Sequence, residues 1–171
     1  MHKYFFSLLL LLIIPFFVYG QNKMDQSSKM ETNYRGIINA LDKGDVSKLD
    51  NYCTSDAVDH DLDPSMTKKT GLAGIKDMFN YYHKLFPDMK TTVHSIAISG
   101  DLLYAHITQT GTASEPYMGM PVGHKMTMDG MDLIRFKGDK AVEHWGFTSN
   151  TDIMKMMPQD KMKQDGMNKK Q

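Results

Sequence analysis

Cysteine is almost missing from this chain of 171 residues, in which Cys53 is the only one. A single cysteine cannot form a disulfide within the chain, so the folded state must be stabilised by packing. The sequence places no motif histidine beside Cys53, and this argues against a thiol nucleophile.

An excess of charge of either sign is also missing, since 20 basic residues balance 20 acidic ones. Without a basic surface, the chain has no electrostatic means of recruiting nucleic acid. The sequence also lacks a phosphate-binding loop, a dinucleotide fingerprint and a nucleophile elbow, so it predicts no cofactor.

Long apolar runs are limited to one, from Phe5 to Val18. This run is shorter than the roughly 20 residues that a membrane-spanning helix requires. Lys3 precedes it, and Gly20 followed by polar residues ends it, which is the layout of a secretory signal peptide at 1–20. The pattern predicts a secreted or periplasmic protein with no membrane association after cleavage. An uncleaved N-terminal anchor is the alternative.

The remaining chain divides into a polar, flexible leader at 21–29, a single domain at 30–155 and a Met/Lys-rich tail at 156–171. Within the domain, apolar residues at helical spacing predict a first helix that ends near Gly44. The same spacing predicts a longer helix from Gly71 to Leu85.

Between these two helices, Asp45 is placed to cap a short third one, and residues 56–61 read as a short extended segment. After Asp88 the apolar period changes to two, which predicts strands. The expected strands are 91–99, 102–112, 124–136 and 140–147. Helices followed by strands predict an α+β domain. We expect three N-terminal helices packed on a curved antiparallel sheet, forming a cone-shaped barrel with an interior pocket.

Short motifs follow one another along the second half of the chain. They are Phe86-Pro87-Asp88, Gly100-Asp101, Gly111-Thr112, Gly119-Met120-Pro121, Arg135, Gly138-Asp139-Lys140 and Glu143-His144-Trp145. In this order and spacing they resemble the SnoaL-like polyketide cyclase, or ester cyclase, family, which has the nuclear-transport-factor-2-like fold. The resemblance implies the same fold with a ligand pocket. It also implies that Gly146 stands where the family's enzymes have a catalytic aspartate, and Asp132 where they have a histidine.

Residues two apart on a strand point to the same side, so His144 shares the pocket face with Gly146. On the neighbouring strand, Asp132 shares its face with Ile134 and Phe136. Apolar surroundings raise the pKa of a carboxyl, which suits a general base. We therefore expect Asp132 to act as base and His144 as proton donor. The alternative is that Asp132 pairs with a cation or caps a loop, and that His144 is a core residue.

His60 is expected at the pocket mouth as an orienting residue, while Tyr82 and Phe86 are expected to line the pocket. Three aspartates surround His60, namely Asp59, Asp61 and Asp63. Such a cluster can bind a metal, but it does not match a calcium loop, so a solvated acidic loop is the preferred interpretation. No metal site is predicted.

Two further features concern surfaces and soft ligands. By strand alternation, the side chain of Trp145 is expected on the outer face of the sheet, which is a candidate homodimer interface. His106 lies on a polar strand face whose role the sequence does not decide.

The chain has 16 methionines, with clusters at 118–131 and 154–167. Thioethers suit Cu(I), but methionine is also an adaptable core filler.

Together these patterns predict an exported domain with an apolar pocket for a small neutral or weakly acidic organic molecule. Its expected chemistry is cofactor-free proton transfer beside a carbonyl group, in a cyclisation, isomerisation or hydrolysis. The alternatives are a pocket protein that binds a ligand without catalysis, and Cu(I) handling by the methionine clusters.

Overall fold

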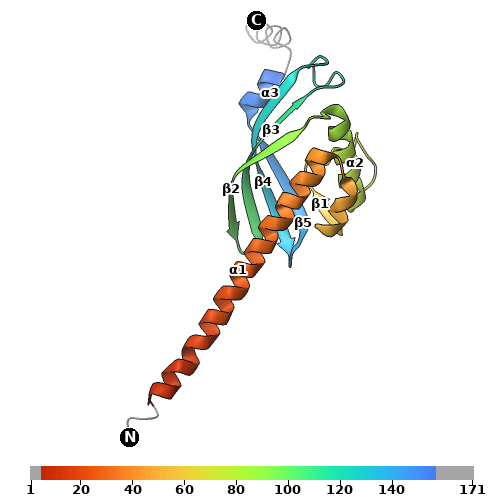
Figure 1. Cartoon of the computed structure of the whole chain (residues 1–171). Coiled ribbons are helices and arrows are strands. Elements are labelled where there is room, and N and C mark those ends of the chain that lie inside the picture. Colours follow the sequence, from red (N-terminus) through yellow and green to blue (C-terminus); the bar gives the residue numbers. More distant parts are fainter. Residues whose placement is uncertain (1–4, 157–171) are drawn as a thin grey trace, which may run out of the picture.

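The protein is described by a computed structural model that covers residues 5–156, with side chains placed for 24–154 (Figure 1). The predicted tail from residue 157 onward lies outside the described residues. The chain forms an α+β fold in which helices precede the sheet. In the described part of the chain, no helix has the length and apolar character that crossing a membrane requires.

Helix α1 runs from Phe5 to Lys43 and therefore includes the segment expected to be a flexible leader, residues 21–29. The described side chains before Met30 are exposed or half-exposed, and Met30 is the first buried one. The helix ends as predicted, because Gly44 has φ +65°, a left-handed conformation that glycine adopts at low cost.

A 3₁₀ helix, η1 (Val46–Asn51), follows where the short helix was predicted. The predicted cap is wrong, because the Asp45 side chain makes no capping hydrogen bond and instead accepts one from the Ser47 hydroxyl. The longer predicted helix is found as α2 (Gly71–Leu85), and a short helix α3 (Asn150–Met156) ends the described chain.

Five strands form one open sheet in the order β1-β5-β4-β3-β2. Four of them match the predicted strands closely, while β1 begins before the extended segment that the sequence indicated. The strands are β1 (Cys53–Asp59), β2 (Lys90–Ser99), β3 (Leu102–Thr112), β4 (Lys125–Lys137) and β5 (Lys140–Thr148).

The sheet is mixed rather than wholly antiparallel, because β1 pairs in parallel with β5. The other pairs are antiparallel and lie next to each other in sequence, as short hairpins require. The connection between β1 and β5 contains α2 and three strands. Parallel strands require a long connection, and this one is long enough for β1 and β5 to run in the same direction. As a result, Asp59 lies opposite His144.

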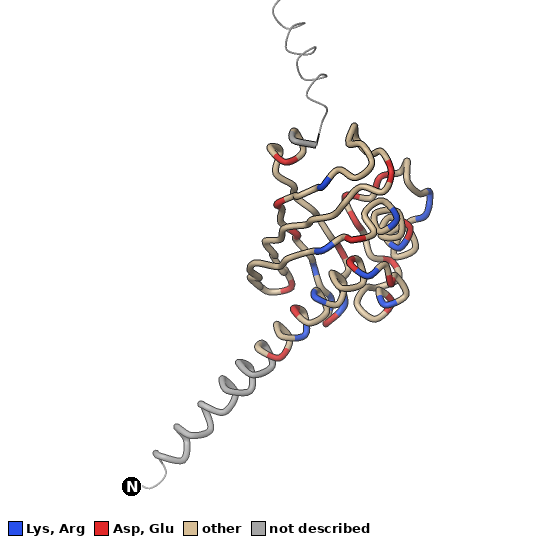
Figure 2. The backbone as a smooth tube through the Cα atoms, turned by 45° about the horizontal axis from the view of Figure 1, so that its top comes forward, with Lys and Arg blue, Asp and Glu red and all other residues tan. Residues whose placement is uncertain are grey.

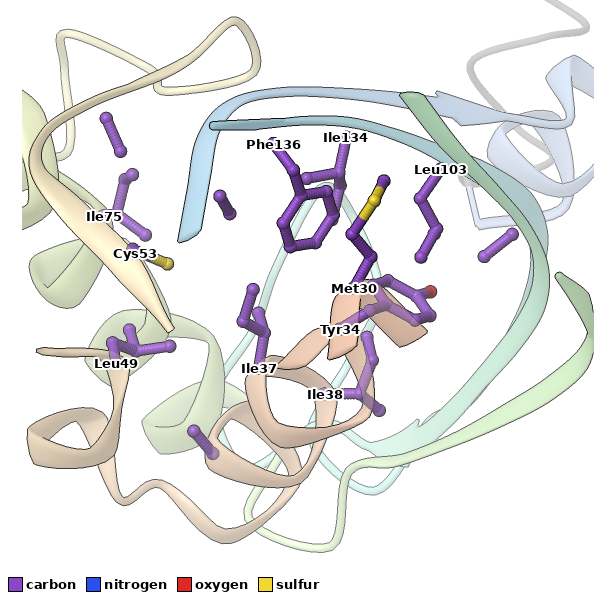
Figure 3. Packing of buried hydrophobic residues seen from close by; sticks show 14 of the residues in the cluster. Met30, Tyr34, Ile37, Ile38, Leu49, Cys53, Ile75, Leu103, Ile134 and Phe136 are labelled. Atoms are coloured by element: carbon purple, nitrogen blue, oxygen red, sulfur yellow. The ribbon is translucent and has the colours of Figure 1, made fainter. Parts of the chain in front are cut away.

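The core lies between α1 and the concave face of the sheet (Figure 3). Tyr34 and Ile37 of α1 point toward Leu103, Ile134 and Phe136 of the strands, as the labelled side chains show. Tyr34 and Leu103 have no exposed surface. Burying such side chains contributes about 1.5–3 kcal/mol each, so this face of α1 is a main source of stability.

A second apolar cluster lies under α2 and includes Phe86, Met120 and Met126. These two methionines have 1% and 3% of their surface exposed, so they fill the core. The core-filler interpretation is therefore correct for both.

The charged residues show no segregation by sign, since acidic and basic positions are interspersed over the described backbone (Figure 2).

Candidate functional site

A cavity of about 380 Å³ lies between α1, α2 and the concave face of the sheet. Most of its wall is apolar and includes Ile37, Phe79, Tyr82, Phe86 and Ile134. Polar side chains gather at one part of the wall, where β1, β4 and β5 meet. Among the described residues that line it, none is a lysine or an arginine.

The centre of this polar part is His144, which lies between two carboxylates. Its Nδ1 is 3.0 Å from Asp59 Oδ2, and its Nε2 is 3.5 Å from Asp132 Oδ1. The Tyr34 hydroxyl donates a 2.8 Å hydrogen bond to the other oxygen of Asp132. Asp59, with a side chain only 3% exposed, is held opposite His144 by the parallel register of β1 and β5.

Burial opposes the charged form of His144, but the hydrogen bonds to Asp132 and Asp59 outweigh it and raise the pKa of the imidazole to about 10. His144 is therefore an imidazolium at neutral pH. A protonated imidazole between two carboxylates is a proton donor or an oxyanion partner, not a general base. The 3.5 Å contact with Asp132 is long for a hydrogen bond, so Nε2–H is the donor more easily redirected to a ligand.

Asp61 supplies a third carboxylate beside Gly146. The Gly146 N–H donates a hydrogen bond to Asp61 Oδ2. A Cβ atom on residue 146 would lie 2.6 Å from that oxygen, so the glycine leaves the space that the carboxylate occupies. Burial raises the pKa of Asp61, although the hydrogen bond from Gly146 opposes the shift.

The structure brings together six of the residues predicted for the site on the cavity wall. These are Tyr82, Phe86, Asp132, Ile134, His144 and Gly146. Asp132 is not a lone carboxylate in apolar surroundings, as the sequence suggested, because Tyr34 and His144 both contact it.

Two predicted residues lie elsewhere. Phe136 packs in the core cluster beside Ile134 and is not among the residues of the cavity wall. His60 lies on the outer face, stacked on Trp145 with ring centroids 4.7 Å apart, and its Nε2 is 2.9 Å from Glu143 Oε1. The predicted position of His60 at the pocket mouth is wrong.

Sequence reasoning missed Asp59, Asp61 and Tyr34 as site residues. The aspartates flank His60 in the chain, so when His60 points outward both of them can point inward. The alternation of side chains along 59–61 could have indicated that Asp59 and Asp61 share one face. The sequence does not show which of the two faces lies toward the cavity, so this signal was not sufficient. The Tyr34 hydroxyl gave no sequence signal, because its partner Asp132 is 98 residues away.

In the cavity wall, one thiol and one carboxylate–histidine group have a possible nucleophilic or metal-binding role. Burial raises the pKa of the Cys53 thiol to about 11, which keeps it protonated and unreactive. Asp59, Asp61 and His144 have ligand atoms within 4.8 Å of one another and could hold a metal ion. A metal bound there would have to displace the proton that Asp59 and Asp132 stabilise on His144, so the arrangement favours proton transfer over metal binding.

The model of the SnoaL-like polyketide cyclase family matches residues 31–159, which includes the helices, the sheet and the cavity wall. The chain belongs to this family. No curated protein matches its sequence.

Solved structures of other proteins share the fold of this chain. IdmH from Streptomyces antibioticus, whose description names it a candidate polyketide cyclase, is 26% identical, with a TM-score of 0.63 over 74% of this chain and 96% of IdmH. TsrD from Streptomyces laurentii is 17% identical, with a TM-score of 0.66 over 75% of this chain and 94% of TsrD. A SnoaL-like polyketide cyclase from Agrobacterium tumefaciens is 16% identical, with a TM-score of 0.62 over 74% of this chain and 95% of its own.

Proposed function

We propose that this protein is an exported SnoaL-like enzyme that transfers protons on a small carbonyl compound without a cofactor. The observation that carries the proposal is the position of His144, a cation between two carboxylates at the polar part of an apolar cavity. The apolar wall would bind the carbon skeleton, and the polar part would face the reacting carbonyl.

His144 is the proposed proton donor. Its Nε2–H would turn from Asp132 to the carbonyl oxygen and stabilise the enolate that forms there. Asp59 and Tyr34 would act as positioning residues, because one fixes Nδ1 of the imidazole and the other holds Asp132. An imidazolium so restrained loses little entropy when the substrate binds.

Asp61 is the proposed base, in place of the Asp132 expected from the sequence. Asp132 already contacts Tyr34 and His144 through both oxygens. The raised pKa of Asp61 brings its carboxylate closer to the basicity that proton abstraction needs. Asp61 would remove the proton from the carbon beside the carbonyl. Return of that proton to another carbon gives isomerisation, and attack of the enolate on a second carbonyl gives cyclisation.

The charge of the cavity narrows the class of ligand. Three aspartates and one imidazolium leave the polar part negative, and no lysine or arginine among the described lining residues offsets it. An anionic substrate would be repelled. We therefore propose a neutral substrate, and exclude the weakly acidic ligand that the sequence left open.

Exchange of carbon-bound protons in D₂O tests the proposed chemistry without knowledge of the natural substrate. A panel of neutral cyclic ketones would be followed by NMR with the wild type and with Asp61→Asn, Asp132→Asn and His144→Gln. We expect Asp61→Asn to slow exchange at least about 100-fold, the lower range of general-base effects. Asp63→Asn is the matched control, since Asp63 follows in the same loop and bonds the Ser65 backbone outside the cavity.

The outcome also decides between catalysis and binding. A stronger effect of Asp132→Asn than of Asp61→Asn would return the role of base to Asp132. Ligands that bind in the cavity but never exchange would favour a non-catalytic binding protein, the alternative that Gly146 supports because it carries no carboxylate of its own. Cu(I) handling by the methionine clusters stays a further alternative; in the tail cluster Met154 and Met156 belong to α3, and the methionines from 157 onward lie outside the described residues.

Export and dimerisation complete the proposal. Export rests on the signal-peptide pattern at 1–20 and is supported by the packing of α1, in which Met30 is the first buried side chain among the described ones, 24 onward. A homodimer through the outer sheet face rests on a half-buried apolar row, in which Tyr104, Leu133 and Trp145 lie side by side across three strands.

A further inference from the structure

Three neighbouring strands present His94, His106 and Asp129 on the outer face of the sheet, opposite the cavity. His106 alternates with the buried Ala105 and Ile107 of β3, so its side chain points outward. His94 sits at a bulge, because the pairing of β2 with β3 shifts between Val93 and Ser95. Bulges redirect side chains, and this one places His94 beside His106.

Hydrogen bonds connect these side chains through the hydroxyl of Thr108 and one carboxylate oxygen of Asp129. His94 Nε2 lies 2.7 Å from Thr108 Oγ1, which donates a 3.1 Å hydrogen bond to Asp129 Oδ1. His106 Nε2 is 2.9 Å from the same Asp129 oxygen. One ligand atom from each of His94, His106 and Asp129 lies within 4.8 Å of the others.

These separations suit a small transition-metal ion after minor side-chain rotation. In a tetrahedral zinc site with Zn–N bonds of about 2.0–2.1 Å, neighbouring donor atoms lie roughly 3.3 Å apart. The three side chains are exposed, so they have room to turn toward one ion. Their backbones belong to paired strands, which keeps the donors near one another before the metal arrives.

The donor types select the class of metal. Two imidazoles and one carboxylate suit zinc and similar divalent transition metals, whereas calcium and magnesium require oxygen ligands. Asp129 supplies a carboxylate oxygen, which zinc accepts beside imidazole nitrogen. The imidazole centroids of His94 and His106 are 4.7 Å apart, close enough for both rings to bind one ion.

The competing explanation is a hydrogen-bonded surface network centred on Thr108. Such a network needs no metal, and it accounts for each contact taken singly. It gives no reason for two histidines and an aspartate from separate strands to bring their donor atoms within 4.8 Å of one another. We propose that His94, His106 and Asp129 bind a zinc-type divalent ion, with water in the remaining coordination positions. The proposal does not depend on the chemistry proposed for the cavity, although Asp129 also belongs to the residues of the cavity wall.

Zinc titration of the full chain, purified without a histidine tag and freed of metal with a chelator, tests the proposal. Competition with a chromophoric chelator would give the affinity and the number of sites. We expect one strong site per chain, weakened at least about tenfold by His94→Ala, His106→Ala or Asp129→Asn, since even outer-shell changes cost 10- to 100-fold. His124→Ala, a half-exposed histidine outside the cluster, is the matched control and should leave the affinity unchanged.

The cavity is the other place where zinc could bind, so His144→Gln must be measured too. Retained affinity in His144→Gln together with losses in the three outer-face variants supports the proposal. Loss in His144→Gln with unchanged affinity in the outer-face variants overturns it and assigns the zinc to the cavity. Absence of a strong site in the wild type overturns it as well. Circular dichroism of the metal-free variants confirms that each is folded.

Discussion

His144 shows how strongly surroundings decide the chemistry of one residue. From the strand pattern alone, His144 would be a histidine with the ordinary imidazole pKa of 6.5. In the folded chain Asp59 and Asp132 contact its two ring nitrogens, and the pKa rises to about 10. The charged imidazole suits the role of proton donor that the sequence predicted for His144.

This pKa has a consequence for stability that can be measured. A histidine with an ordinary pKa of 6.5 that rises to about 10 on folding stabilises the native state fully below pH 6.5. The contribution then declines as pH rises and is lost above about pH 10. We expect the difference in unfolding free energy between wild type and His144→Gln to fall steadily from pH 6 to pH 10.

Urea unfolding at several pH values gives this difference directly, and comparison with the variant removes the titration of all other groups. His83→Gln, a change in α2 away from the cavity wall, serves as the control and should show no such trend. A difference between wild type and His144→Gln that stays constant over the range would contradict the assigned protonation state.

At the scale of elements, α1 combines two parts with different surroundings. From Met30 onward its buried residues recur at helical spacing and pack on the sheet. The described side chains of 24–29 are exposed or half-exposed. The buried side chains described for α1 therefore all belong to the chain that signal-peptide cleavage would leave.

A chain that begins at Gln21 should consequently fold as well as the full chain. We expect its unfolding free energy to stay within about 0.5 kcal/mol of the full-length value, the usual range for surface changes. Replacing Met30, which has no exposed surface, by alanine in the same shortened chain should cost about 2–5 kcal/mol. Chemical denaturation measures both, and a shortened chain as unstable as the Met30→Ala variant would show that residues before Gln21 carry packing.

The element that the sequence described least well is β1. Its alternation was visible only from residue 56, and its partner could not be inferred because β5 is about 85 residues away. The hairpins β2–β3 and β4–β5, joined by Gly100 and Gly138 at φ +64° and +65°, were predicted from local sequence. Local turns carry their own signal, whereas a parallel pairing depends on the packing of everything between the two strands.

On the scale of the whole molecule, the sheet separates two faces with different chemistry. The concave face encloses the cavity with its carboxylates and His144, and the outer face carries Trp145 under Arg135, whose guanidinium lies 5.5 Å from the ring centroid. Leu133 lies beside Trp145 on this outer face. A second copy of the chain docked there would leave the cavity open.

If two copies of the chain associate through the outer sheet face, a charged side chain introduced into the row of Tyr104, Leu133 and Trp145 should weaken the dimer. Leu133→Glu places a carboxylate in the half-buried row, and we expect it to convert a dimer into a monomer in sedimentation velocity. Ser99→Glu, at the exposed end of β2, should leave the dimer intact. Identical sedimentation of wild type and Leu133→Glu as monomers would exclude the proposed interface.

The sequence by itself determined the α+β class, four of the five strands and the face on which Asp132 and His144 lie. These features depend on hydrophobic period and on turn residues, which act over a few positions. Only the tertiary structure decided that Tyr34, Asp59 and Asp61 join them, and that His60 does not. Each of these contacts joins segments some 80 to 100 residues apart, as between Tyr34 and Asp132 or Asp59 and His144. Such contacts are set by the packing of α1 and β1 on the sheet, and no local pattern encodes that packing.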